Sequence, residues 1–248
     1  MQNRYLKITA VIGLAMLTGA CAASRSVVEI QEPAKIENPA TGPAVKIVSV
    51  EDKRQFEIDP STPDIPSLSN DEIDDVTFTS RAYARKRNTY GMALGDVLLP
   101  EGKTVADAVN KAISNGFKQA GYRVLEPGDA EYDSADAVDA DLIKFWSWFE
   151  PGFWQVTVHN KSEVTLKGNE LNKGEPVTVT DSYQEKMQMV LDSDWQSSGD
   201  ALLRTMTGIH CQAGATQLQR LLQHAIAENG VKKLKGLVFI GDAMEESL

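Results

Sequence analysis

The sequence predicts an α+β fold in which an antiparallel β-meander packs against one main helix, followed by a C-terminal α/β segment. Three observations lead to this prediction. Alternating β-branched and aromatic residues recur between residues 141 and 182, apolar residues recur at helical spacing over residues 105–120, and a second amphipathic helix precedes an apolar strand near the C-terminus. Runs of period two and of period 3.6 therefore occupy separate stretches, which is typical of this fold class.

The first twenty-one residues have the pattern of an export signal. Arg4 and Lys7 supply positive charge, Ile8–Leu17 is an apolar run, and small residues follow it. A helix that spans a bilayer needs about 20 apolar residues, so this run is too short for one. A buried core helix is the alternative, but the polar, proline-bearing stretch that follows favours a signal peptide over residues 1–21.

The signal ends in the sequence Leu-Thr-Gly-Ala-Cys, which resembles the bacterial lipobox. The resemblance implies that Cys21 receives a diacylglycerol thioether and becomes the acylated first residue of the mature protein, with palmitate-like chains as its only covalent group. Several acyl chains on one residue make a stable membrane anchor. Ala22, where inner-membrane lipoproteins carry Asp, implies the outer membrane and a periplasmic location. An ordinary signal with an incidental cysteine is the alternative.

Composition excludes several classes of function. The chain of 248 residues has a formal net charge of −10 and a pI near 4.9. Nucleic-acid binding requires basic patches, so nucleic acid is not expected as a partner. Electrostatic attraction to anionic lipid is also excluded, which leaves the acyl chains as the expected membrane contact. Cys211 has no second structural cysteine to pair with, so no disulfide framework or zinc site is expected.

The stretch after the signal is expected to be a flexible tether over residues 22–44, because prolines and scattered charges interrupt any periodicity. Residues 45–50 alternate and are β-branched, which predicts the first strand. Residues 51–75 combine three prolines with many acids and predict a long solvated loop. Its aspartates lack the spacing and the turn glycine of a calcium loop.

A basic cluster follows the loop. Arg81, Arg85, Lys86 and Arg87 fit a surface strand or loop edge, and an anion site is the alternative. A short strand is expected over residues 94–99, before Pro100.

The clearest helix is expected over residues 105–120. Thr104, with Asp107 three residues later, predicts a capped N-terminus, and Gly121 is placed for a left-handed C-terminal cap. A strand over residues 122–125 follows at once, which makes an α/β packing unit.

Four strands are expected to form the meander, over residues 141–150, 153–159, 162–167 and 177–182. Simple alternation along the first of these places Leu142 and Trp146 on one face and Phe145 on the other. Trp146, Trp148 and Trp154 gather near one hairpin end. Burial in the core is the simpler interpretation, while a partner-binding or membrane-dipping patch is the functional one.

Residues 45–190 resemble the YajG-type family of small bacterial lipoproteins. The shared features are the lipobox, the strand after a proline-rich stretch, the helix closing on Gln119-Ala120-Gly121-Tyr122-Arg123-Val124, and Ala140-Asp141-Leu142-Ile143 leading into a meander. That family has no established biochemical activity. The resemblance therefore implies an anchored periplasmic domain and supplies no catalytic residues.

Residues 193–248 resemble part of a von Willebrand factor A-like domain, through Trp195, the run from Cys211 to Leu218 and the run from Val238 to Glu246. The resemblance implies that Thr216 and Asp242 would help to hold Mg²⁺. The Asp-x-Ser-x-Ser loop that opens such a site does not precede them, so Mg²⁺ is not expected. A C-terminal cover for the meander and a reading frame that joins two genes near residues 190–195 are the alternatives.

The sequence thus predicts a lipid-anchored outer-membrane lipoprotein that faces the periplasm and acts as a non-catalytic structural or interaction module. A partner-binding module of von Willebrand A type is the competing hypothesis. An enzyme is not expected, because no nucleophile–base pair, phosphate loop or metal-ligand cluster occurs in the sequence.

Overall fold

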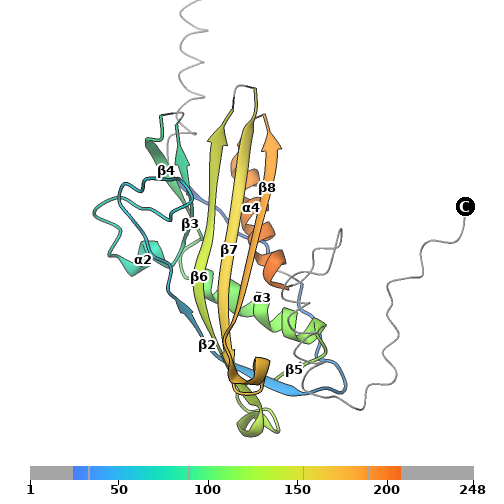
Figure 1. Ribbon diagram of the computed structural model, residues 1–248. Coiled ribbons are helices and arrows are strands. Elements are labelled where there is room, and N and C mark those ends of the chain that lie inside the picture. Colours follow the sequence, from blue (N-terminus) through green and yellow to red (C-terminus); the bar gives the residue numbers. More distant parts are fainter. Residues whose placement is uncertain (1–24, 33, 89, 153, 189, 208–248) are drawn as a thin grey trace, which may run out of the picture.

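The computed structural model describes residues 25–32, 34–88, 90–152, 154–188 and 190–207, and it confirms the α+β class. The strands are β1 (Ser26–Val27), β2 (Ala44–Asp52), β3 (Ala82–Arg87), β4 (Ala93–Leu98), β5 (Arg123–Val124), β6 (Asp136–Pro151), β7 (Val156–Gly168) and β8 (Val177–Met187). The helices are α2 (Val76–Thr79), α3 (Val105–Gln119) and α4 (Asp192–Thr207), with 3₁₀ turns η1 (Tyr132–Ser134) and η2 (Leu171–Gly174). Both long helices lie on one face of the sheet (Figure 1).

The sheet is mixed, because it contains parallel as well as antiparallel strand pairs. Along one edge of β6 runs antiparallel β7, which pairs in turn with β8. The other edge of β6 is shared by two parallel strands, with β2 beside its first half and β3 beside its second. The strands expected over 153–159 and 162–167 form one continuous β7. The polar residue between them, Asn160, is buried and accepts a 2.7 Å hydrogen bond from Ser147 instead of forming a turn.

A β-bulge in β6 changes which side chains share a face. Leu142 pairs with Val164 and Lys144 with Glu163, so one extra residue is inserted on β6 between them. Alternation restarts after the insertion. Leu142 and Phe145 therefore point into the same helix-covered core, and the predicted grouping of Leu142 with Trp146 was wrong.

Helix α3 has the predicted limits and caps. The hydroxyl of Thr104 accepts a hydrogen bond from the amide of Asp107 at 3.1 Å and donates one to its carboxylate at 2.7 Å. Gly121 takes a left-handed conformation (φ +90°), and the amide of Tyr122 bonds back to the carbonyl of Phe117. The predicted apolar face is buried, as Val105, Ala108, Val109, Ala112, Ile113 and Phe117 show.

Helix α4 belongs to the same core, which moves the expected boundary near residues 190–193. Trp195, Leu202 and Leu203 are almost completely buried. The Tyr83 hydroxyl donates to the Trp195 carbonyl at 3.3 Å, and burial raises the pKa of that phenol far above its usual value. Residues 192–207 therefore complete the helix layer, and residues 208–248 lie outside the described part of the chain.

The segment expected to be a tether is docked on the domain from Arg25 onward. Strand β1 pairs in parallel with β4, and Val28 and Ile30 are buried in the helix-covered core. Gly199 of α4 leaves room for Ile30, because a Cβ at position 199 would lie 2.4 Å from Cγ1 of Ile30. Further along, Asn115 of α3 holds this segment through the amide of Ile36 and the carbonyl of Ala34. Apolar residues set among the polar ones explain why the tether prediction was wrong for residues 25–44.

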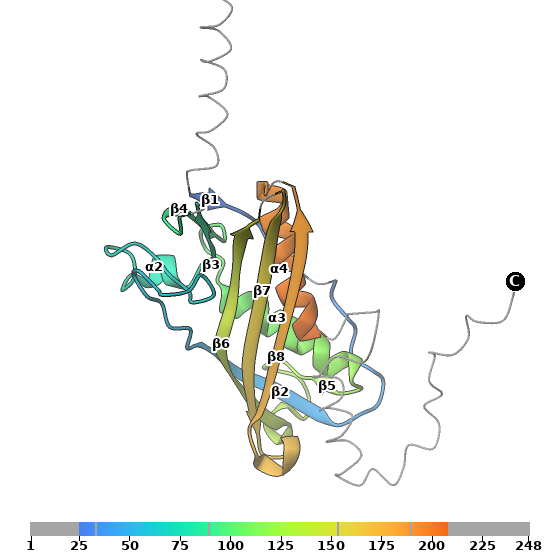
Figure 2. The same cartoon turned by 45° about the horizontal axis from the view of Figure 1, so that its top comes forward.

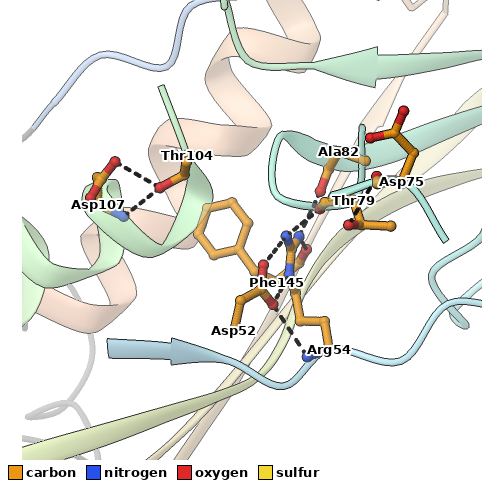
Figure 3. Close-up of polar contacts among 8 residues, drawn as sticks. All are labelled: Asp52, Arg54, Asp75, Thr79, Ala82, Thr104, Asp107 and Phe145. Carbon is orange, nitrogen blue, oxygen red and sulfur yellow. Dashed lines mark hydrogen bonds and ion pairs between the residues drawn. The ribbon is translucent and has the colours of Figure 1, made fainter. Parts of the chain in front are cut away.

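The opposite face of β6 is covered by the acidic loop over residues 53–75. Trp146 is fully buried there beside Leu68 and Phe56, and its indole nitrogen donates to the Pro63 carbonyl at 3.1 Å. The side chain of Arg54 is completely buried. It points toward the residues that flank the loop, Asp52, Thr79 and Ala82 (Figure 3). The loop is therefore a structural layer, and the expectation of a solvated excursion was wrong for this part of it.

Candidate functional site

A pocket of about 680 Å³ lies where β1, β4, α2 and the start of α3 meet. Its lining combines apolar, charged and hydroxyl-bearing side chains. The lining residues are Arg25, Val27, Thr77, Phe78, Ser80, Arg81, Leu98, Glu101, Gly102, Lys103 and Thr104. The pocket is partly open to solvent.

Local sequence shapes the rim of the pocket. Gly102 takes a left-handed conformation (φ +77°) in the turn that follows Pro100, and the amide of Lys103 bonds to the Pro100 carbonyl at 3.2 Å. The amide of Val105 then donates to the Ser80 carbonyl at 2.9 Å, which ties the start of α3 to the end of α2. The first amides of α3 are thus used within the protein and do not point to a free anion site.

The cations at the pocket already hold anionic or carbonyl partners. Arg25 donates to Glu72 at 2.6 Å and to Asp96 at 2.9 Å, and its guanidinium lies 4.8 Å from the Phe78 ring centroid. The hydrogen bond to Glu72 raises the pKa of Arg25 above its usual value. Lys103 pairs with Glu29 across the rim. An anionic ligand would have to compete with these carboxylates.

Behind the pocket, β3 carries buried charges. Arg85 and Lys86 are almost fully enclosed, so the surface-edge interpretation was wrong for these two residues. Arg85 faces Asp96 at 3.5 Å, and Lys86 donates to the Ser26 hydroxyl at 2.6 Å. Burial, with help from the neighbouring Arg85, lowers the pKa of Arg87. These cations hold β1 and the loop against β3. At the pocket itself, an anionic ligand meets cations that already have partners.

The pocket residues do not form a recognisable catalytic set. Its hydroxyls come from Thr77, Ser80 and Thr104, and the eleven lining residues include no histidine or cysteine that could act as a general base or nucleophile. Among the residues that the structure describes, no cluster of histidine, cysteine and carboxylate side chains could hold a metal ion.

The three predicted tryptophans have three different environments. Trp146 is fully buried and belongs to the core under the loop, so a partner-binding role for it was wrong. Trp148 is half-buried and stacks on His159, with ring centroids 5.1 Å apart and planes 7° from parallel. Trp154 is 84% exposed, next to the β6–β7 turn. Of the three, only Trp154 has a mostly exposed side chain.

Sequence reasoning missed two exposed apolar residues that lie at the β3–β4 turn. Tyr90 is 88% exposed and Met92 is 62% exposed. The signal was present, because Asn88 and Gly91 are turn residues between two strand-like runs.

The remaining predicted site residues lie outside the described part of the chain. These are the lipidation candidate Cys21 and the pair Thr216 and Asp242. Within the described part, no helix is both long enough and apolar enough to cross a membrane.

Comparisons with known proteins add little. No protein-family model matches the chain, and no curated protein matches it. One similar solved structure is the crystal structure of an uncharacterized protein, with 10% sequence identity and a TM-score of 0.34. The match covers 82% of this chain and 97% of that chain. A similarity of this size carries no information about function.

Proposed function

We propose that this protein is an outer-membrane lipoprotein whose Cys21 carries the lipid and whose folded domain faces the periplasm as a non-catalytic interaction module. The observation that carries the proposal is the lipobox-like run ending at Cys21, which stands five positions before Ser26, where β1 pairs with β4. An acylated cysteine in this position would hold the domain directly at the membrane surface.

The docked N-terminal segment supports this arrangement. Residues 25–44 run from β1 over α3 to β2, with Ile30 buried against α4 and Asn38 paired with the backbone of Val124. A pull on the anchor would therefore be transmitted to the core of the domain. The pattern of residues 1–20 and Ala22 support export and an outer-membrane destination.

The interaction role is supported by the surface chemistry. The open pocket combines apolar side chains with charged side chains that are paired, as docking surfaces do. A net charge of −10 makes nucleic acid an unfavourable partner. The resemblance to YajG-type lipoproteins points the same way.

The C-terminal extension is part of the proposal. Residues 193–248 resemble part of a von Willebrand factor A-like domain, and we propose that this segment works without Mg²⁺ at Thr216 and Asp242.

The test is the mass and location of the protein made in a Gram-negative host. We expect the intact mass of residues 21–248 plus a diacylglyceryl and acyl adduct, and co-sedimentation with outer membranes. Cys21→Ser removes the adduct and the membrane association. Cys211→Ser, which changes the other cysteine, keeps both. A wild-type chain without the adduct, or a lipidated Cys21→Ser chain, contradicts the proposal.

A further inference from the structure

We propose that the β3–β4 and β6–β7 turns contact the lipid of the membrane that holds the anchor, with Tyr90, Met92 and Trp154 as the side chains that enter its interface. This inference rests on the proposed function, because it takes Cys21 as the lipidated residue.

The two turns lie at the same end of the sheet. Strands β3 and β6 are adjacent and parallel, with Ala84 opposite Ser147. From that pair, β3 runs three residues to its end at Arg87 and β6 runs four residues to its end at Pro151. We call this the turn end of the sheet. Figures 1 and 2 show both turns at the same end of the molecule, near the start of the docked chain.

The turn end concentrates exposed apolar side chains. Tyr90 and Trp154 are 88% and 84% exposed, and Met92 is 62% exposed. Leu191 is 56% exposed and follows β8. The last residue of β8, Met187, pairs with Val156 just after the β6–β7 turn, so Leu191 lies near the same end. Four of the nine large hydrophobic side chains exposed in the described part of the chain thus gather at this end. Clusters of this kind mark an interaction surface.

The length of the chain before β1 brings the anchor to this end. Strand β1 is parallel to β4, with Ser26 opposite Val97, so the chain enters β1 from the turn end. Cys21 stands five positions before Ser26, and Met92 stands five positions before Val97. An extended chain rises at most about 3.6 Å per residue, so each interval spans at most about 18 Å. Measured along the strand direction from β1 and β4, Cys21 therefore reaches no farther than about the β3–β4 turn. If the acyl chains on Cys21 lie in a bilayer, that turn lies at the bilayer surface.

Local hydrogen bonds hold the turns in shape. The side chain of Asn88 accepts from the amides of Tyr90 and Met92, each at 2.9 Å, and Arg87 donates to the Gly91 carbonyl at the same distance. In the second turn, the amide of Gly152 donates to the Gln155 carbonyl at 2.7 Å. Residues held by such bonds lose less conformational entropy when they bind than free residues do.

The residue types fit a lipid interface, and the short interval between Cys21 and β1 favours lipid over a protein partner. Tyrosine and tryptophan are enriched at the level of lipid headgroups, since each ring has an apolar body and a polar group. The net charge of −10 would oppose binding to anionic headgroups. The acyl chains therefore hold the domain at the membrane, and the apolar contacts of the turns orient it.

Quenching of tryptophan fluorescence by brominated lipid tests the inference. The full-length lipidated protein is reconstituted into phosphatidylethanolamine–phosphatidylglycerol vesicles that contain brominated phosphatidylcholine. Trp146 and Trp195 are fully buried and should not be reached. We expect clear quenching in the wild type and the loss of most of it in Trp154→Phe. Bromine near the headgroup should quench more than bromine near the chain end.

Two further variants sharpen the test. Trp148→Phe is the matched control, because Trp148 is half-buried against His159, and it should keep the quenching. Tyr90→Trp in the Trp154→Phe background should restore quenching, because it reports on the other turn.

The outcomes separate the two proposals. A protein that has the lipid mass and floats with the vesicles but shows no bromine quenching overturns this inference alone. It would mean that the turn end faces away from the bilayer or is covered by another protein chain. A wild-type chain without the lipid mass overturns the proposed function, and this inference with it.

Discussion

The two faces of the sheet are covered by different means. On one face, α3 packs on β2, β5 and β6, and α4 packs on β6, β7 and β8, around a core of buried apolar side chains. On the other face, the loop over residues 53–75 covers a smaller cluster around Trp146. A helix satisfies its own backbone groups, whereas a loop leaves carbonyls and amides to be paired. The loop-covered face therefore depends on buried charged side chains.

Arg54 shows how the loop-covered face is stabilised. Its guanidinium forms a bidentate pair with Asp52 at 2.8 and 2.7 Å and donates to the carbonyls of Ala82 and Thr79 at 2.6 and 2.8 Å (Figure 3). The same group lies 5.3 Å from the Phe56 ring centroid. One side chain thus joins β2, α2, β3 and the loop.

The largest expected effect comes from removing this group. Arg54→Met keeps most of the volume but leaves the Ala82 and Thr79 carbonyls and the Asp52 carboxylate without their donor. We expect the free energy of unfolding to fall by about 2–6 kcal/mol, measured by urea denaturation, since each buried acceptor left unpaired costs about 1–3 kcal/mol. Lys111→Met removes an exposed ion pair between Lys111 of α3 and Glu32. This control should change the free energy of unfolding by less than about 1 kcal/mol. Equal losses in the two variants would mean that Arg54 is not the anchor of the loop.

The helix-covered face should respond to volume instead of charge. Gly199→Ala places a Cβ against Ile30, and overpacking of this kind costs about 1–3 kcal/mol, partly offset by about 0.5–1 kcal/mol of helix propensity. We expect a net destabilisation of the order of 1 kcal/mol. In an Ile30→Ala background, which removes the two nearest atoms, the same change should cost nothing.

A double-mutant cycle on these two positions measures that coupling. Additive effects of Gly199→Ala and Ile30→Ala would show that the N-terminal segment does not pack on α4. The two faces could then no longer be contrasted on the basis of this contact.

The capping of α3 gives a smaller effect that is local to the helix-covered face. Thr104→Ala removes the acceptor for the Asp107 amide, and we expect a loss of about 1 kcal/mol in the free energy of unfolding. Thr104→Ser keeps the hydroxyl and should stay close to the wild type. If the serine variant loses as much as the alanine variant, the cap is not the cause.

The helix-covered face was the more predictable of the two. The apolar spacing over residues 105–120, the Thr104 cap and Gly121 are local signals, and all of them are confirmed. Ile30 and Trp195 were missed as parts of this core because their contacts are with residues far away in the sequence. No local period shows which distant helix an isolated apolar residue meets.

The loop-covered face was largely hidden in the sequence. The composition of residues 51–75 predicted exposure to solvent. The sequence does not distinguish a buried arginine such as Arg54 from a surface one, because its carbonyl partners are distant in the chain. The bulge after Leu142 also left no composition signal, yet it decides that Trp146 points to the loop. At the turn end of the sheet, Trp154 could be proposed from its residue type alone. That Trp154 and Tyr90 lie at the same end follows only from the pairing of β3 with β6.

The smallest expected effect is a dependence on pH, with opposite signs on the two faces. On the face away from the helices, Asp141 accepts from Lys167 at 2.5 Å and lies 2.8 Å from Lys53. The hydrogen bond from Lys167, followed by the one from Lys53, lowers the pKa of Asp141. A carboxyl with a lowered folded-state pKa adds stability above its unfolded value of about 3.9, and that stability is lost as the pH falls through the folded value. Asp141→Asn should therefore lose stability at neutral pH and differ little from the wild type in strong acid.

On the helix-covered face, burial raises the pKa of Asp200, although its carboxylate accepts from the Gln31 amide at 2.6 Å. A raised folded-state pKa makes the charged form costly, so this carboxyl subtracts stability as the pH rises through the unfolded value of about 3.9 toward neutrality. Thermal unfolding from pH 3 to pH 7 should therefore show the gap between Asp200→Asn and the wild type moving in favour of the variant as the pH rises. For Asp141→Asn the gap should move in favour of the wild type. Asp139→Asn, on the same face as Asp141 and bonded to the Ser49 hydroxyl, is the control for the loss of a surface charge. If Asp141→Asn and Asp200→Asn shifted in the same direction, net charge and not the local environment of each face would explain the pH dependence.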